Sequence, residues 1–448
     1  MADTLSAPPA DQTNLRWFQG IPKYSWFVLA IAAMGWLFDT MDQNLYNLVA
    51  QKSIRDLITG TVPEDQMQNA VNSWRGSITS VFLIGWAVGG FIFGIMGDKI
   101  GRTRTLVITI LTYALFTGLS GLAQNPIQYM IFRFFTALGV GGEFAAGVAL
   151  VAEVFPNRSR PMALGLLQAL SAVGNIMAGM IVFFIGDMHW RYVFFIGALP
   201  ALLVVWIRRA VKEPEKWQQA KDEAAEDDVK KELGNIKELY RDPILRRNTI
   251  AGVLLAIAGV GGVWGVAFWL KDLLDIALAP LNLTPKARSD YGSIAFVIQN
   301  IGAGLGMMSY AAISERIGRK RTMFFMFILA FCAVQGTFWF VNSYLSAMFW
   351  AFALGYFAFM PFGAFCVYFP ELYPTRLRTT GVGFCYNCAR IFAAPTPFIL
   401  GNLSGYFAAQ HGATVGFRMA ASVVAFVYIS GFIGLIFAPE TKGKPLPE

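Results

Sequence analysis

Long apolar runs recur along this chain, and they constrain its fold more than any other feature of the sequence. A helix needs about 20 residues to cross roughly 30 Å of hydrocarbon. The runs are continuously apolar and do not alternate, which favours helices over barrel strands. They lie near residues 25–47, 75–96, 105–123, 127–150, 163–186, 192–208, 249–270, 291–312, 322–341, 345–368, 381–401 and 416–437. We therefore expect an all-α membrane protein with twelve transmembrane helices.

The composition agrees with a chain that uses lipid as its solvent. Of the 448 residues, 56% are hydrophobic and 14% are charged, values that a water-exposed surface would not tolerate. Residues 1–24 carry Pro, Asp and Gln without an apolar core. This segment is therefore expected to be a tail and not a signal peptide.

Lys and Arg collect in the loops on one side of the expected helices. These loops include residues 99–104, 158–160, 316–321 and 376–378 and the segment 208–247, whereas the opposite loops hold few cations. This bias marks the cytoplasmic side and predicts that both termini are cytoplasmic, in a cell (inner) membrane. It also accounts for the net charge of +8 without a nucleic-acid partner.

Three loop motifs occur twice, in the same order and at nearly the same spacing. GDKIGRTR at 97–104 returns as SERIGRKR at 314–321, EVFPNRSR at 153–160 returns as ELYPTRLR at 371–378, and Pro214-Glu215 returns as Pro439-Glu440. This repetition predicts two pseudo-symmetric six-helix bundles. Their expected bounds are 25–208 and 249–437, with a linker at 209–248 and a C-terminal tail at 438–448.

The linker is rich in Glu, Asp, Lys and Gln. We expect it to hold short amphipathic helices on the membrane surface. A solvated spacer is the favoured interpretation, and a regulatory element is the alternative.

The repeated loops resemble those of the major facilitator superfamily, and the resemblance covers nearly the whole chain. In the signature loop of that family, an Asp and an Arg, here Asp98 and Arg102, join a charge network that holds the cytoplasmic gate shut. A carboxylate can cap a helix N-terminus and pair with a guanidinium, which fits that role. The resemblance implies gating by Gly97, Asp98, Gly101, Arg102, Glu153, Arg158, Arg160, Glu315, Gly318, Arg319, Glu371, Arg376 and Arg378.

Within the superfamily, two further stretches are similar to the sialate and monocarboxylate proton symporter branch. They are R-x5-G-x-G-G-E at 133–143 and the Trp-Arg pair at 190–191. The C-terminal PETKG at 439–443 is similar to sugar porters, but the seventh span lacks the paired glutamines of that branch. The resemblance therefore implies a carrier that imports a small organic anion together with a proton.

Three acidic residues within the spans are candidates for the coupling proton. Asp39 and Asp42, spaced i,i+3, share one face of the first span, and two close carboxylates in a low dielectric do not both ionise easily. The alternative is that the span ends early and Asp42 caps a helix in water. Glu143 follows Gly141 and Gly142 in the fourth span, and it either relays a proton or hydrogen-bonds a neighbouring helix.

Arg390 in the eleventh span is the main candidate for an anion site, because a guanidinium offers a fixed fork of donors to a carboxylate. The alternative is an internal ion pair with Asp39 or Asp42. Arg133 lies ten residues before Glu143, about 15 Å along a helix and too far for a direct pair. We expect Arg133 near the outer end of its span, where it either snorkels to water or contacts substrate.

Other polar and aromatic residues in the spans complete the expected substrate site. Asn175, Gln168, Gln299, Asn300 and Asn387 are candidates for orienting a small polar ligand, and Trp264, Phe268 and Tyr356 are candidates for the cavity wall. Cys385 and Cys388 have C-x-x-C spacing, but no second pair or His lies nearby in the sequence, so a metal site is not expected.

These features predict a proton-coupled symporter that takes up a small organic anion by alternating access. A sugar or organic-cation carrier and a transport-inactive receptor of the same fold remain as alternatives. An enzyme is not expected, because the chain has no P-loop and only two histidines. The expected partners are the substrate, protons and the lipid bilayer, with no cofactor, and a monomer is the family expectation.

Overall fold

The computed structural model describes residues 16–185, 189–202, 210–226, 232–278, 284–393 and 395–447. Within these ranges the chain is mostly helical and has no β-strand. Ten of the described helices are long and apolar enough to cross a membrane. The sixth predicted span lies partly outside the described residues, and the eleventh is divided into two helices near Pro395. The expectation of an all-α membrane protein is confirmed.

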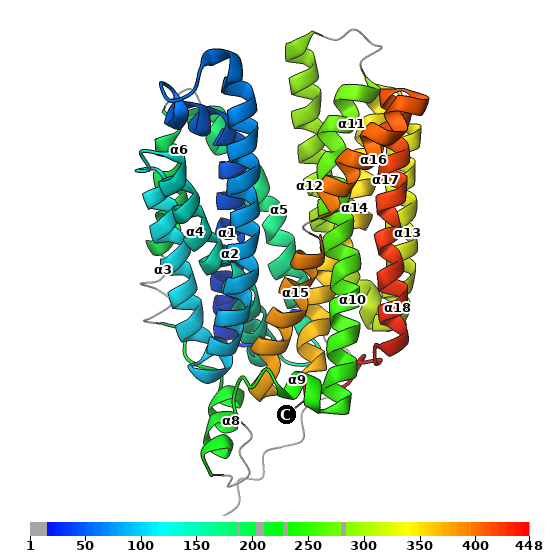
Figure 1. Ribbon diagram of the computed structural model, residues 1–448. Helices are drawn as coiled ribbons and strands as arrows, with labels where there is room; N and C mark the ends of the chain where they lie inside the picture. The colour runs from blue at the N-terminus through cyan, green and yellow to red at the C-terminus, as the bar shows by residue number, and fades with distance from the viewer. Residues whose placement is uncertain are drawn as a thin grey trace, which may run out of the picture.

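The N-terminal half of the chain forms one bundle of helices (Figure 1). Its elements are α1 (Lys23–Ile58), η2 (Glu64–Gln66), α2 (Met67–Lys99), α3 (Arg102–Ser120), α4 (Pro126–Val154), α5 (Arg160–Ile185), α6 (Arg191–Gly197) and η3 (Leu199–Leu202). Helix α1 continues beyond the predicted end of the first span at residue 47, because hydropathy detects only its apolar part.

The C-terminal half forms a second bundle beside the first (Figure 1). Its elements are α10 (Pro243–Gly265), η4 (Ala267–Trp269), α11 (Leu270–Ala277), α12 (Pro285–Ile317), α13 (Arg319–Phe340), α14 (Tyr344–Tyr368), η6 (Phe369–Leu372), η7 (Thr375–Leu377), α15 (Arg378–Ala393), α16 (Thr396–His411), α17 (Ala413–Val424), η8 (Ala425–Tyr428) and α18 (Ile429–Phe437). Helix α10 begins at Pro243, before the predicted start of the seventh span at 249, because the side chain of Asp242 caps it.

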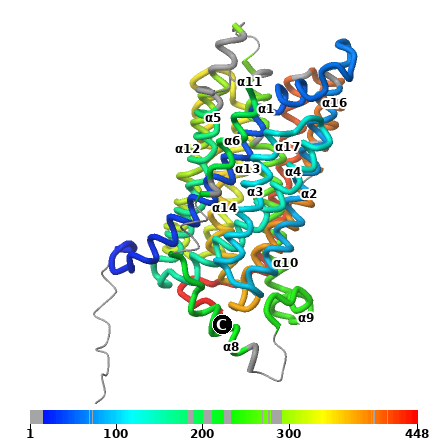
Figure 2. Tube along the Cα trace, turned by 90° about the vertical axis from the view of Figure 1, so that its left-hand side faces the viewer, coloured from blue at the N-terminus to red at the C-terminus, as the bar shows by residue number. Residues whose placement is uncertain are grey.

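The linker contains α8 (Glu215–Glu226) and α9 (Glu238–Arg241). Figure 2 shows both helices at the same end of the molecule as the C-terminal residues, with α11 and α16 at the other end. We call the former the basic end, because it carries the repeated loops 97–104 and 314–321. The linker contacts a loop of each bundle at this end: Trp217 donates a hydrogen bond to the Asp98 carbonyl, and the Gly234 N–H donates to the Arg376 carbonyl.

The repeated loops fold alike because each needs a glycine in a left-handed conformation. Gly101 has φ 111° and Gly318 has φ 99°, values that other residues rarely adopt. A side chain at either glycine would also meet a carboxylate, Glu213 in the first copy and Glu440 in the second. These acids accept backbone N–H groups at the starts of α3 and α13. The structural equivalent of Glu440 is therefore Glu213, and not Glu215 as the repeated Pro-Glu pair suggested.

Helices α2 and α15 bring the two bundles into contact at the basic end. A β-carbon on Gly383 would lie 2.8 Å from the Gly90 carbonyl oxygen, and one on Gly97 would lie 2.5 Å from the Thr379 side chain. Small residues thus allow these two backbones to approach closely.

Candidate functional site

A cavity of about 80 Å³ lies between the two bundles. Side chains of α1, α2, α4 and α5 line it from one bundle, and side chains of α10, α12, α14 and α15 line it from the other. A volume of this size holds a few waters. A larger ligand therefore requires the two bundles to separate.

Asp39 contributes the acid of this central cavity. Its side chain lines the cavity, and the residue is only 1% exposed. Neither carboxyl oxygen has a hydrogen-bond partner within the described part of the chain. A carboxylate ion in such surroundings costs several kcal/mol unless a nearby positive charge compensates it, so Asp39 is a group that can exchange a proton here.

Arg390 contributes the cation and comes from the opposite bundle. Its guanidinium carbon lies 3.9 Å from the ring centroid of Trp86 and 4.0 Å from that of Tyr386. Nη1 donates to the Asn387 amide oxygen at 2.6 Å, and Nε has no partner among the described residues. The alternative of an ion pair with Asp39 or Asp42 is not seen, since neither carboxylate lies within 4.0 Å of this guanidinium. Arg390 therefore has donor capacity available for an anion.

Asp42 does not share the environment of Asp39, contrary to the expectation from their spacing. It is fully buried between α1, α3 and α4. There it forms an ion pair with Arg133 at 3.0 Å and accepts a hydrogen bond from Thr117 at 2.9 Å. Arg133 is likewise fully buried and packs over Tyr46. The expectation that Arg133 snorkels is wrong, because its charge is neutralised inside the bundle. Neither residue lines the central cavity.

Glu143 lies deeper in the N-terminal bundle and also does not line the cavity. It is 1% exposed, and neither carboxyl oxygen has a hydrogen-bond partner among the residues that the structure describes. A β-carbon on Gly35 would lie 2.1 Å from its Oε1. Because Gly35 is one helical turn before Asp39, the Glu143 carboxyl group packs against α1 next to the cavity acid.

Three hydrogen-bonded asparagines in the wall of the central cavity connect the two bundles. Asn44 donates to Asn175 at 2.7 Å, and Asn175 donates to Asn300 at 2.8 Å. Beyond them lies an outer cavity of about 70 Å³, lined by Lys271 and Gln299 among others. Asn175 and Asn300 were expected at the site.

Several site residues were missed in the sequence. Asn44 lines both cavities, and Trp36, Thr40 and Gln43 line the central one. Trp36 and Gln43, at i−3 and i+4 from Asp39, could have been expected on its helix face, whereas Thr40, at i+1, could not.

Of the remaining predicted substrate residues, Gln168 and Gln299 line a cavity and Asn387 does not. Gln168 lines the central cavity and accepts a hydrogen bond from the Cys366 thiol at 3.2 Å, whereas Gln299 donates to the Ala267 carbonyl. Asn387 packs against Gly90 and reaches the cavity only through Arg390.

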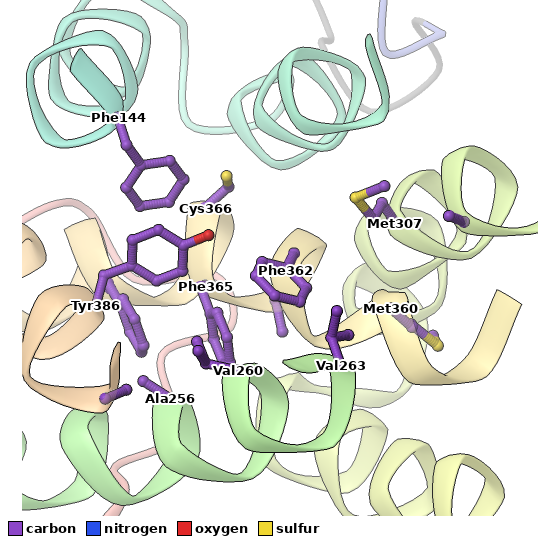
Figure 3. Close-up of a cluster of buried hydrophobic side chains, with 14 of the residues drawn as sticks. Phe144, Ala256, Val260, Val263, Met307, Met360, Phe362, Phe365, Cys366 and Tyr386 are labelled. Atoms are coloured by element: carbon purple, nitrogen blue, oxygen red, sulfur yellow. The ribbon is translucent and has the colours of Figure 1, made fainter. Parts of the chain in front are cut away.

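Among the predicted wall residues, Trp264 lines the central cavity. Tyr356 does not: it lines a groove between α12, α13 and α14, because Gly302 and Gly306 let α14 pack closely on α12. The side chain of Phe268 lies outside the described residues. Tyr386 stacks on Phe144 of the other bundle with ring centroids 4.2 Å apart (Figure 3).

At the basic end, the first repeated loop binds the opposite bundle. The Asp98 carboxylate accepts the backbone N–H groups of Thr379 and Thr380 at 3.1 and 2.8 Å, and it lies 3.2 Å from Arg102. Arg102 in turn donates to the Thr375 carbonyl. These contacts join the two bundles at the basic end.

The second repeated motif adds one ion pair between the bundles. Glu153 of α4 pairs with Arg102 at 3.0 Å and with Arg378 of the other bundle at 2.7 Å. In the second copy, Arg319 pairs with Glu315 at 2.7 Å and with Glu371 at 3.0 Å, both within its own bundle.

Three other predicted gate arginines have local partners. Arg158 donates to the Gln19 carbonyl, Arg160 donates to the Ala152 carbonyl and to Asn157, and Arg376 pairs with Glu238 of the linker. None of these four contacts joins one bundle to the other.

The described residues contain no group of three or more His, Cys, Asp or Glu that could hold a metal ion. Cys385 instead contacts the Tyr373 hydroxyl at 3.0 Å.

Known proteins share both the sequence and the fold of this chain. It is 28% identical to the probable 4-methylmuconolactone transporter of Cupriavidus pinatubonensis, over 91% of this chain and 89% of the relative. It is 30% identical to the cis,cis-muconate transport protein of Acinetobacter baylyi, over 83% and 86%. The solved structure of the proton:xylose symporter XylE is similar with a TM-score of 0.74 at 18% identity, and the match covers 95% of this chain and 98% of XylE.

A family model described as Major Facilitator Superfamily matches residues 52–397, more than half of the chain. The two-bundle fold, the central cavity and the repeated loops agree with that match. The chain belongs to the major facilitator superfamily of membrane transporters.

Proposed function

We propose that this transporter imports a small organic anion together with a proton. The anion binds Arg390 through its carboxylate, and the coupling proton binds Asp39. The basic end is cytoplasmic in this proposal, as the positive-inside bias indicates, and the membrane is the cell (inner) membrane.

One observation carries the proposal: Asp39 and Arg390 come from opposite bundles and line the same cavity. Neither has an ion pair among the described residues, so each can bind a charged partner from solution. A site between the bundles can be exposed alternately to the two sides when one bundle rocks against the other.

The same pair gives a reason for obligatory coupling. In the empty carrier, ionised Asp39 and Arg390 compensate each other's charge across the cavity. In the loaded carrier, a proton neutralises Asp39 and the anion neutralises Arg390. A carrier that has bound only the proton or only the anion would hold an uncompensated charge when its cavity closes. Such a charge costs several kcal/mol in a dry cavity.

The names of the relatives agree with an organic acid as substrate. One relative is named for muconate, an organic anion, and the other for 4-methylmuconolactone. At 18% identity, the likeness to the xylose symporter supports the fold and not a sugar substrate.

The test uses purified protein in liposomes that contain a pH-sensitive dye. Adding a small carboxylate such as muconate outside should acidify the interior, and Arg390→Ala should abolish this signal. Arg390→Lys is the matched control, because it keeps the charge but loses the fork of donors, and we expect weakened uptake.

Other outcomes would point to the alternatives. Sugar uptake that is insensitive to a protonophore would overturn proton symport of an anion. Carboxylates that bind tightly without flux would indicate a receptor. Thermal stabilisation by carboxylates that survives Arg390→Ala unaltered would exclude the proposed anion site.

A further inference from the structure

A long apolar groove runs along the C-terminal bundle, apart from the central cavity. It has a volume of about 500 Å³ and lies between α12, α13 and α14. Figure 1 shows α13 at the outer edge of this bundle, away from the other bundle. Phe325, Leu329 and Phe349 in its wall are 55%, 43% and 64% exposed. The groove therefore opens toward the surrounding lipid.

The groove is longer than the hydrocarbon depth of one lipid leaflet. Ile317 lines it at the basic end, and Phe352 lines it farther along, beside Gly302. Gly302 and Ile317 are 15 residues apart on α12, which corresponds to about 22 Å. Half of the hydrocarbon thickness of a bilayer is about 15 Å. An acyl chain from the leaflet at the basic end can therefore lie along the groove.

A cation stands at the basic end of the groove, on the same helix face as its apolar wall. Arg321, Phe325 and Leu329 follow one another at intervals of four residues on α13, so they form one stripe. Phe325 and Leu329 line the groove, and Arg321 is exposed one turn before them. A cation followed by apolar side chains matches a phospholipid, in which a charged headgroup is followed by hydrocarbon chains.

Arg316 and Lys320 are two further cations close to Arg321 in the sequence, and no acid in the described part of the chain pairs with any of the three. The side chains of Arg316, Lys320 and Arg321 make no hydrogen bond or ion pair with any residue that the structure describes. Lys442 is adjacent, because its Nζ donates to the Arg316 carbonyl at 2.8 Å.

The nearby acids are already engaged. Glu315 pairs with Arg319 at 2.7 Å, and Glu440 accepts the backbone N–H groups of Arg319 and Lys320. The charge left over at this end of the groove is therefore positive.

We propose that this groove is a binding site for an anionic phospholipid. One acyl chain lies between α12, α13 and α14, and the phosphate group contacts Arg316, Lys320 and Arg321. The match of charge favours an anionic headgroup over a zwitterionic one, which brings its own cation. With the basic end cytoplasmic, the lipid would come from the leaflet whose anionic lipids attract basic segments.

The N-terminal bundle supplies a matched comparison. Arg104 occupies the position of Arg321 in the first copy of the repeat, and Glu213, which caps α3 as Glu440 caps α13, lines the hollow beside it. This hollow extends along α3 only as far as Ile108. It therefore extends less far along its helix than the C-terminal groove, which reaches Leu329, although its volume of about 590 Å³ is similar.

The test is native mass spectrometry of the purified full-length protein with phosphatidylglycerol and phosphatidylcholine of identical acyl chains. We expect preferential retention of phosphatidylglycerol by the wild type. Each cation removed should weaken that retention by up to about fivefold. Arg321→Gln alone should lower it, and the triple variant Arg316→Gln, Lys320→Gln, Arg321→Gln should bring the two lipids to parity.

Two further variants separate the parts of the site. Arg104→Gln should leave phosphatidylglycerol retention unchanged, and Leu329→Trp, which fills the groove without altering charge, should lower retention of both lipids. Equal retention of the two lipids by the wild type would overturn the proposal, as would an effect of Arg104→Gln equal to that of Arg321→Gln. Glycerol phosphate that displaced the lipid completely would show a free-anion site in place of a lipid groove. A thermal unfolding scan confirms that each variant is folded.

Discussion

Asp98 and Glu315 occupy the same position in the two copies of the repeated loop, yet they bind different partners. Asp98 accepts two backbone N–H groups from the start of α15 in the other bundle. Glu315 pairs with Arg319 in its own bundle and is partly exposed. The repeat thus duplicates the local loop, but only the first copy joins the bundles through this acid.

The second motif shows the same asymmetry. Glu153 pairs with Arg378 across the interface, whereas Glu371 pairs with Arg319 inside one bundle. The difference teaches that contacts within a helix pair follow the repeated sequence, whereas contacts between bundles depend on how the bundles are docked. We therefore expect the N-terminal copy to control closure of the basic end.

The buried charges differ between the bundles as well. The N-terminal bundle holds Asp42 and Arg133 as an ion pair, together with the acids Asp39 and Glu143, whose carboxyl oxygens have no hydrogen-bond partner in the described part of the chain. In the C-terminal bundle, Arg390 is the charged residue that lines the central cavity. One bundle thus supplies groups suited to a proton, and the other supplies a group suited to an anion.

The largest expected effect separates the two buried arginines. Arg133→Ala leaves Asp42 buried without its partner, which should lower the free energy of unfolding by about 3–5 kcal/mol. Arg390→Ala breaks no ion pair and should cost much less. Chemical unfolding of the two purified variants measures the difference. The double variant Arg133→Ala, Asp42→Asn should recover part of the loss, and failure to recover any would show that the ion pair is not the cause.

The next effect concerns the two loop acids. Asp98→Asn replaces the carboxylate that caps α15 by a neutral amide and so weakens its two hydrogen bonds to the backbone. This change should shift the equilibrium toward opening of the basic end by about 1.5–3 kcal/mol. Glu315→Gln removes a partly exposed pair and should change the same equilibrium by less than about 1 kcal/mol. Distances between spin labels on α2 and α15 report the opening. Equal shifts in both variants would remove the proposed asymmetry.

A smaller effect distinguishes two acids of the N-terminal bundle. Glu143→Gln replaces an unpartnered acid by a neutral group of the same shape and should change the free energy of unfolding by less than about 1 kcal/mol. Asp42→Asn leaves Arg133 unpaired and should cost several kcal/mol. Thermal unfolding of both variants provides the comparison. A large loss in Glu143→Gln would mean that Glu143 is ionised and paired in the folded protein.

The smallest effect depends on pH and tests the helix-capping acids. Burial opposes ionisation of Glu440, but the backbone N–H groups of Lys442, Arg319, Lys320 and Thr441 outweigh it and hold the pKa of this carboxyl below its usual value. Its contribution to stability is therefore complete above the usual carboxyl pKa and declines as the pH falls toward the lowered value. Hydrogen exchange at the start of α13 should report a loss of about 0.5–1 kcal/mol on acidification.

The control for this pH effect is Glu440→Gln, which should make the opening free energy at the start of α13, obtained from exchange rates corrected for the intrinsic rate at each pH, independent of pH over the same range. Glu213→Gln alters the cap of α3 and should leave α13 unchanged. A pH dependence that persists in Glu440→Gln would assign the titration to another group.

Much of the fold was predictable because bilayer thickness sets the length of each apolar run. The repeated loops, the glycines at 101 and 318 and the candidacy of Asp39 and Arg390 also followed from local sequence. The exact helix ends did not, since polar turns extend α1 and a side-chain cap starts α10 early.

The sequence by itself determined which residues are polar at membrane depth, because a charge in hydrocarbon is costly wherever the helix lies. Only the tertiary structure decided which of them are already neutralised. Asp42 and Arg133 are 91 residues apart and meet through the packing of α1 against α4. Asp39, three residues from Asp42, turns instead to the cavity that Arg390 shares. Helix rotation and bundle docking set these pairings, and neither is encoded in the spacing of residues along one segment.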